Sequence, residues 1–367
     1  MHKNVSLLSF FIVTILPLAV TAQEESSSLE FAGYQWRVAA RQAEVVNHLG
    51  REALRLGAGR VIADDIVLIN GVIRFDAAFT EQQSFIGAGW RAENDQNFEE
   101  MYFRAHLNND PDTLQYTPVY NGLSAWQMFY DGQSIAPLQH RYGEWNEVKI
   151  VVDGDSAEIF YNSEEPALHI SKLDRNPVSG AINLRVTGQG SEPVYFSNFS
   201  VSQLSSSDRI TPQAMEDISL PAGLITHWQV SAPFGEEEVS VKLNLASTNT
   251  ENLDWQTMAV GEHGFVNLAK LHPATPDHNT VWLRTNISVD SPQPKEMLFG
   301  YSDRVRIYLN GKRLYTGIGG WRIRNYSFMG LVSFHDAVVL NLNTGNNELL
   351  IAVSETFGGW GWGAAID

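Results

Sequence analysis

The chain of 367 residues contains no cysteine. Disulfide bridges, thiol chemistry and zinc–thiolate sites are therefore excluded. Positive charge is also scarce, because 25 Lys and Arg stand against 42 Asp and Glu and the formal net charge is −17. A protein this acidic repels phosphate backbones, so we expect no nucleic-acid partner.

Several catalytic and metal-binding patterns are missing as well. The His residues show no HExxH spacing, no Ser lies in a nucleophile elbow, and no Gly-rich loop precedes a helix. We therefore expect no metal ligands and no cofactor. Structural calcium stays open, because Asp153 and Asp155 flank Gly154, but calcium needs six or more oxygen ligands and a plain turn is favoured.

One long apolar run occurs at the start of the chain. The basic start MHKN is followed by VSLLSFFIVTILPLAV and by small residues at Val20 and Ala22. This order is typical of a secretory signal peptide, so we assign residues 1–22 to one and expect cleavage after Ala22. The run is short and interrupted, and no later segment is apolar enough to cross a bilayer. We expect a secreted or periplasmic protein without a membrane span.

Short alternating runs separated by turn residues fill most of the remaining chain. Strands or hairpins are predicted at residues 52–56, 71–79, 85–91, 98–107, 114–120, 125–130, 147–152, 157–161, 181–186, 195–201, 225–234, 281–289, 304–317 and 338–355. The pattern predicts an all-β protein of two tandem β-sandwich (jelly-roll) domains. We place them at residues 30–203 and 222–367, joined by a linker at 204–221 that is rich in Ser, Asp and Pro.

The stretch EEMYFRAHL, residues 99–107, separates into an apolar and a polar parity. Alternate residues of a strand face opposite sides of the sheet. One side therefore carries Glu100, Tyr102, Arg104 and His106, which we expect to face a groove or open water. Tyr102, Arg104 and His106 are the candidate catalytic residues, with Gln115 or Tyr116 on the adjacent strand.

Aromatic and planar polar residues gather next to this row and in a later loop. Sugar sites combine aromatic faces with such polar groups. The candidate ligand-binding residues are Glu100, Tyr102, Arg104, Tyr116, Asn121, Trp126, Gln127, Trp321, Arg322 and Tyr326. For Trp126 the alternative is a core-facing stripe with Met128 and Tyr130, and for Trp360 and Trp362 in the tail we favour packing.

Two resemblances extend these predictions. Residues 30–203 contain NGVIRFDAAF and WNEVKIVVDGDSAEIFYN, and this region resembles the concanavalin A-like lectin/glucanase superfamily in its laminin-G-like form. Residues 222–367 contain WQVSAPF, SDRVRIYLNGKRLYTG and GNNELLIAVSETFGGWG, and resemble a galactose-binding-like jelly roll. The pairing is similar to secreted bacterial proteins that combine these two modules.

These resemblances imply a fold but leave the activity open, because both superfamilies contain enzymes and pure binders. We expect an exported, non-catalytic protein that binds carbohydrate or polysaccharide. A polysaccharide lyase, in which Arg104 would neutralise a uronate, is the first alternative. A glucanase is disfavoured because the acids at 93, 95, 99 and 100 lack the alternate spacing of that site. A protein-interaction module is the third option.

Overall fold

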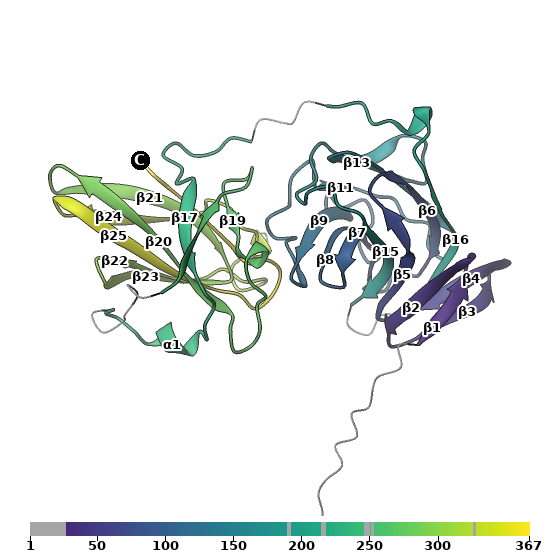
Figure 1. Ribbon diagram of the computed structural model, residues 1–367, viewed down its shortest axis with the longest axis horizontal. Helices are drawn as coiled ribbons and strands as arrows, with labels where there is room; N and C mark the ends of the chain where they lie inside the picture. Colours follow the sequence, from purple (N-terminus) through teal and green to yellow (C-terminus); the bar gives the residue numbers. More distant parts are fainter. Residues whose placement is uncertain (1–26, 189–191, 214–217, 246–249, 251–252, 326–327) are drawn as a thin grey trace, which may run out of the picture.

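The computed structural model describes residues 27–188, 192–213, 218–245, 250, 253–325 and 328–367. The predicted signal peptide lies outside these ranges. Within them, the chain forms four sheets in which every strand pair is antiparallel. Figure 1 shows the strands grouped into two side-by-side bodies, and the all-β fold class is confirmed.

The first body, which we call the first sandwich, contains β1–β16. One sheet has the order β1-β2-β5-β15-β7-β8-β9-β10, with β11 also paired to β9, and the other has the order β14-β13-β12-β6-β16-β4-β3. The bounds are β1 Ser28–Phe31, β2 Tyr34–Ala40, β3 Ala43–His48, β4 Arg51–Leu56, β5 Gly59–Leu68, β6 Gly71–Ala78, β7 Phe85–Asn94, β8 Asn97–Arg104, β9 Leu114–Tyr120, β10 Leu123–Ser124, β11 Ile135–Ala136, β12 Asn146–Asp153, β13 Ser156–Tyr161, β14 Pro166–Ile170, β15 Gly180–Thr187 and β16 Val194–Ser202.

The second body, the second sandwich, contains β17–β26. Its sheets have the orders β18-β17-β20-β25-β22-β23 and β19-β26-β21-β24. The bounds are β17 His227–Ser231, β18 Trp255–Ala259, β19 Val266–Asn267, β20 Thr280–Val289, β21 Gln293–Ser302, β22 Arg304–Leu309, β23 Lys312–Ile318, β24 Asp336–Leu342, β25 Gly345–Ser354 and β26 Gly361–Ile366.

Helical structure in the described ranges is limited to single turns, η1 Ser206–Asp208, α1 Glu237–Ser240 and η2 Leu268–Lys270. None of these helices has the length and apolar character that crossing a membrane requires. The predicted linker falls between β16 and β17, and residues 214–217 of it lie outside the described ranges. Asp153, a candidate calcium ligand, instead binds Arg209 of this segment at 2.8 Å.

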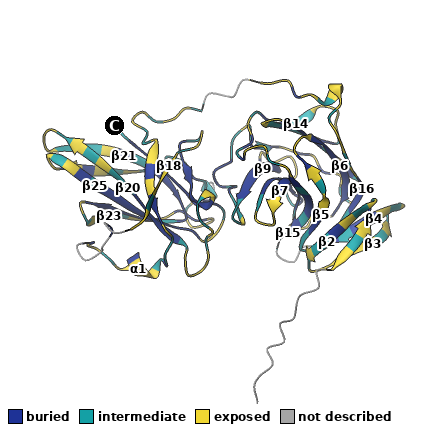
Figure 2. Ribbon diagram, viewed as in Figure 1, coloured by how far each residue is buried: buried dark blue, intermediate teal, exposed yellow. Residues whose placement is uncertain are grey.

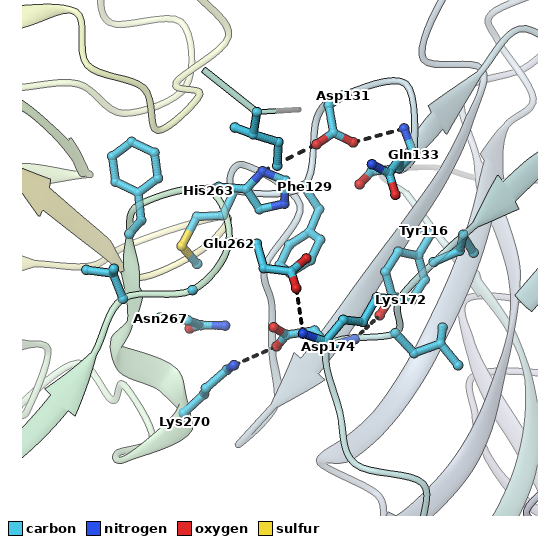
Figure 3. Close-up of a pocket in the computed structure, with 18 of the residues that line it drawn as sticks. Tyr116, Phe129, Asp131, Gln133, Lys172, Asp174, Glu262, His263, Asn267 and Lys270 are labelled. Carbon is cyan, nitrogen blue, oxygen red and sulfur yellow. Dashed lines mark hydrogen bonds and ion pairs between the residues drawn. The ribbon is translucent and has the colours of Figure 1, made fainter. Parts of the chain in front are cut away.

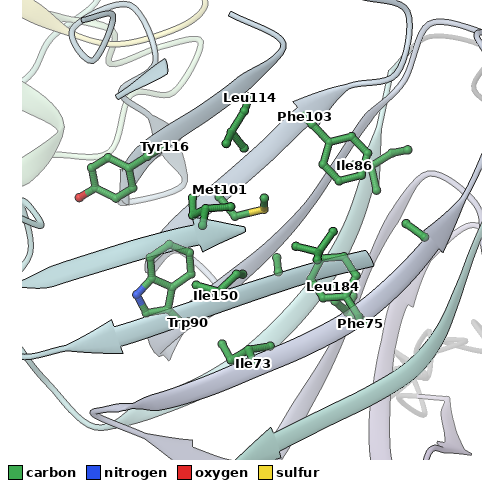
Figure 4. Packing of buried hydrophobic residues seen from close by; sticks show 14 of the residues in the cluster. Ile73, Phe75, Ile86, Trp90, Met101, Phe103, Leu114, Tyr116, Ile150 and Leu184 are labelled. Atoms are coloured by element: carbon green, nitrogen blue, oxygen red, sulfur yellow. The ribbon is translucent and has the colours of Figure 1, made fainter. Parts of the chain in front are cut away.

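The core of the first sandwich lies between its two sheets. Apolar residues of alternate parity, such as Met101 and Phe103 on β8, meet Ile73 and Phe75 on β6, and Trp90 is fully buried among them (Figure 4). Each large apolar side chain removed from water stabilises the fold by about 1.5–3 kcal/mol. The apolar parity predicted for residues 99–107 is thus the core face of β8. Figure 2 shows exposed residues on the outlying strand β3 and buried residues along the strands that enclose the core.

The second core contains the two tail tryptophans. Trp360 and Trp362 are fully inaccessible to solvent and pack in the same cluster as Trp228 and Phe299. The Trp362 ring lies 5.6 Å from the Trp228 ring in an edge-on arrangement. The prediction that these tryptophans pack rather than form a sugar platform is therefore confirmed.

One strand prediction is wrong. Residues 125–130 form a turn after β10, because the backbone bonds that a strand would need are made elsewhere. Met128 N donates to Ala125 O at 2.9 Å, and the Gln115 side-chain amide donates to Trp126 O at 2.8 Å. This turn places Trp126 and Met128 on different sides of the local backbone: Met128 enters the core, whereas Trp126 is half-buried.

Candidate functional site

The polar row of β8 and β9 forms an internal hydrogen-bond network. Tyr102 pairs with Gln115 across the two strands, and Tyr102, Arg104 and Gln115 are all buried. Tyr102 Oη donates to Gln115 Oε1 at 2.8 Å, and Arg104 Nη2 donates to the same oxygen at 2.7 Å. Arg104 also donates to the carbonyl of Asp112. These donors are therefore used within the protein.

The two ends of this row differ in their surroundings. Glu100 is completely buried and forms an ion pair with Arg185 of β15. Burial raises the pKa of Glu100, and the Arg185 charge opposes that effect. His106 is half-buried with its ring 5.5 Å from the Phe85 ring, and burial lowers the pKa of His106. Of the three candidate catalytic residues, Tyr102 and Arg104 share one partner, while His106 packs beside Phe85.

Tyr116 lies on the other face of the sheet. It pairs with Met101 and belongs to the core cluster, so the interpretation that placed it beside the polar row is wrong and Gln115 occupies that place. Tyr116 Oη donates to Glu99 Oε2 at 2.9 Å, and the Arg175 backbone N–H donates to Glu99 Oε1 at 2.9 Å. Burial of this carboxyl raises the pKa of Glu99 to about 7.

Asn121 and Gln127 connect the two sandwiches. Asn121 Nδ2 donates to Ala269 O at 2.8 Å. Ser302 Oγ donates to Gln127 Oε1 at 2.7 Å, and Val332 N donates to Gln127 O at 2.9 Å. Both predicted ligand-binding amides thus contact the second sandwich.

Three aromatic rings from both sandwiches meet at this border. Phe357 lies with its ring centroid 6.1 Å from that of Trp126 and 6.1 Å from that of Trp321. Phe357 is 58% exposed, Trp321 is 40% exposed and Trp126 is half-buried. We call Trp126, Phe357 and Trp321 the aromatic surface. The Arg322 guanidinium lies 4.1 Å from the Trp321 ring centroid, and Tyr326 lies outside the described residues.

A buried carboxylate holds the loops that present two of these rings. Asp303 is 2% exposed, and its Oδ2 accepts hydrogen bonds from Thr356 N at 2.9 Å and from Phe357 N at 2.8 Å. Gly319 N donates to the Asp303 carbonyl at 2.7 Å. Hydrogen bonds from backbone N–H to a carboxylate are stronger than neutral ones. Asp303 therefore fixes both the Phe357 loop and the start of the Trp321 loop.

Gly358 allows the Phe357 loop to approach the first sandwich. Its φ is +115°, and a Cβ at this position would lie 2.5 Å from Gln127 Oε1 and 2.8 Å from Trp126 Nε1. Any other residue would collide with the turn that carries Trp126. The close contact of the two sandwiches at the aromatic surface thus depends on this glycine.

A second carboxyl lies beneath the same loop. Glu355 is 2% exposed, and Gly359 N donates to its Oε1 at 3.4 Å. Burial raises the pKa of Glu355 well above its usual range, which favours the neutral acid. Within the part of the chain that the structure describes, no three His, Cys, Asp or Glu side chains gather closely enough to hold a metal ion.

Sequence reasoning identified Trp126, Trp321 and Arg322 but missed Phe357 and Asp303. In the sequence Phe357 is followed by two glycines, a pattern that indicates a loop carrying an aromatic side chain. The sequence-based prediction for the tail concerns only Trp360 and Trp362. No local pattern identifies Asp303, because its role arises from the contact between the end of β21 and the loop after β25.

Comparisons with known proteins give a fold likeness only. No protein-family model and no curated protein sequence matches the chain. A carbohydrate-binding module from Bacillus subtilis aligns with a TM-score of 0.34 and 11% identity over 44% of this chain and 92% of its own. A Bacillus subtilis protein with a galectin-like fold gives 0.35 and 14% over 46% and 89%. A Bacillus licheniformis β-glucanase gives 0.33 and 10% over 47% and 92%. At these scores the likeness assigns neither ligand nor activity.

Proposed function

We propose that this is an exported, non-catalytic carbohydrate-binding protein that captures polysaccharide through the aromatic surface. The observation that carries the proposal is the exposure of Trp321 and Phe357 next to Trp126, on loops anchored by Asp303. Exposed rings held in place lose little conformational entropy when a sugar face packs on them. The Arg322 guanidinium lies 4.1 Å from the Trp321 ring centroid, a cation–π contact that helps to hold this ring.

The degradative alternative is less well supported. A lyase or hydrolase on the first sandwich needs polar groups that can reach substrate. Tyr102 and Arg104 are buried and donate to Gln115, and Glu100 is paired with Arg185. The aromatic surface, in contrast, is accessible without any rearrangement. We therefore favour binding over catalysis.

The test is retention of the mature chain on immobilised polysaccharides, both neutral and uronate-containing. We expect Trp321→Ala and Phe357→Ala each to lower the affinity at least about tenfold. The matched control is Trp255→Ala, because Trp255 also has an arginine, Arg284, 4.0 Å from its ring centroid, but packs against the cluster of Trp282 and Tyr308. Unchanged retention of both surface variants would refute the proposal.

We further propose that residues 1–22 are a signal peptide and that the two sandwiches are separate domains with a boundary within 204–221. The apolar run and the small residues before Gln23 support the first point. Separate apolar cores in the two sandwiches support the second. Mass spectrometry of the exported protein should give an amino terminus at Gln23, and limited proteolysis should cut first between the sandwiches.

A further inference from the structure

A cavity of about 530 Å³ lies between the two sandwiches, separate from the aromatic surface. The first sandwich contributes residues such as Tyr116, Phe129 and Lys172, and the second contributes Met258, His263 and Asn267 (Figure 3). None of the three aromatic-surface residues lines this cavity. A volume of this size is within the range of small-molecule sites, which are often formed at domain borders.

Asn267 supplies a buried donor that faces this cavity. Its Oδ1 accepts a hydrogen bond from Ala269 N at 3.2 Å and so caps η2. This bond fixes the amide orientation and directs Nδ2 away from the helix, as Figure 3 shows. Asn267 is only 8% exposed, and Nδ2 has no hydrogen-bond partner among the described residues. A buried donor in this state favours a ligand that brings an acceptor oxygen.

The rest of the lining is amphiphilic. Phe129, Met258 and Val260 offer apolar surface, while Ser134 and Asn176 offer hydroxyl and amide groups. A sugar ring has the same mixture, with C–H faces and hydroxyl edges, whereas a purely apolar ligand would leave the polar groups unpaired. The lining therefore fits a saccharide better than a hydrocarbon.

The ionisable residues at the cavity already pair with one another across the border. Lys172 lies 2.5 Å from Glu262, Lys270 lies 2.8 Å from Asp174, and His263 lies 3.3 Å from Asp131. Figure 3 shows these pairs linking one sandwich to the other. A charged ligand would have to displace a partner from one of these pairs, whereas a neutral ligand would not. The charges thus select against uronates.

We propose that this cavity is a second binding site that takes one or two units of a neutral saccharide, with Asn267 Nδ2 donating to a sugar oxygen. The site is independent of the aromatic surface, and only the choice of a sugar rests on the proposed function. The two sites take different ligands: the aromatic surface binds the polysaccharide chain, and the cavity binds a short, uncharged saccharide.

The experiment uses the mature full-length Trp321→Ala variant, so that the aromatic surface is weakened, and isothermal titration with cellobiose, laminaribiose, maltose, sucrose and digalacturonate. We expect saturable binding of at least one neutral disaccharide below about 10 mM and none of digalacturonate. Ala259→Trp, which fills the cavity from an exposed lining position, should abolish it. Asn267→Ser, which keeps a capping oxygen but removes the amide donor, should weaken it about tenfold.

Ala337→Trp, an exposed position on β24 outside the lining, is the control and should leave binding unchanged. Thermal melting of each variant checks that it is folded. The inference is overturned if no neutral disaccharide binds, if binding survives both Ala259→Trp and Asn267→Ser, or if only digalacturonate binds. Retention of wild-type protein on polysaccharide, lost in Trp321→Ala, would still support the proposed function in each of these cases.

Discussion

The polar row of the first sandwich and the aromatic surface at its border both contain residues that the sequence marks as candidates for ligand binding, but the two regions differ in exposure. Tyr102 and Arg104 are 4% and 6% exposed and bind Gln115, whereas Trp321 and Phe357 are 40% and 58% exposed. Polar groups paired inside the protein stabilise and orient the sheet, because leaving any of them unpaired is costly. Rings exposed on anchored loops contribute little to folding and remain available to a ligand.

This difference separates stability from binding. Changes in the polar row should lower the free energy of unfolding, whereas changes in the aromatic surface should lower affinity and leave stability nearly unchanged. Arg185→Met and Trp321→Ala test the two sides of that division.

The largest effect is expected for Arg185→Met. Glu100, which is fully buried, would lose its ion-pair partner, and an unpaired buried charge costs about 3–5 kcal/mol. Urea denaturation at neutral pH measures the loss. The double variant Glu100→Gln/Arg185→Met removes the unpaired charge and should recover most of the lost free energy of unfolding.

In the same assay Trp321→Ala should change the free energy of unfolding by less than about 0.5 kcal/mol. Equal losses for Arg185→Met and Trp321→Ala would contradict the division.

The next effect concerns Glu99, which neighbours Glu100 but lies on the core face. Its pKa is about 7 in the folded protein because of burial, whereas an unfolded Glu titrates near about 4.3. Between these values the unfolded chain has lost the proton that the folded protein keeps. Stability therefore falls by up to about 1.4 kcal/mol per pH unit as the pH rises, and the loss is complete above the folded pKa.

Glu99→Gln keeps an acceptor for the Arg175 N–H and cannot ionise. As the pH rises from 5 to 8, we expect the free energy of unfolding of the variant to increase by about 2–3 kcal/mol relative to that of the wild type. Urea denaturation of both proteins at several pH values in this interval measures the difference. Parallel profiles would mean that Glu99 is not the group responsible.

The sequence predicted which side chains share a face of a strand better than it predicted what each face contacts. Alternation in residues 99–107 correctly separated the core face, with Met101 and Phe103, from the polar face. It could not show that the polar face is internally paired, because Gln115 lies on the neighbouring strand β9 and Arg185 lies on β15, two strands away from β8. Strands β1–β3 were missed, since their burial alternates only weakly, and the long strands β5 and β21 were missed as well.

Contacts between the sandwiches were likewise beyond local pattern. Trp126 and Trp321 are each predicted from the aromatic and polar residues around them in the sequence. Their common neighbour Phe357 and the position of Asn267 at the cavity depend on the contact between the two sandwiches. Long-range placement of this kind depends on shape and on glycines such as Gly358.

The smallest effect is expected for Lys172→Ala, which breaks an ion pair between the sandwiches. The Lys172 and Glu262 side chains are 55% and 39% exposed, so solvent and salt screen the interaction. We expect a loss below about 0.5 kcal/mol that disappears in high salt, measured by urea denaturation at two salt concentrations. Ser302→Ala, which removes a fully buried donor to Gln127, should cost about 1–2 kcal/mol at both concentrations. If the order were reversed, the border between the sandwiches would be held mainly by its exposed charges and not by the buried hydrogen bond between Ser302 and Gln127.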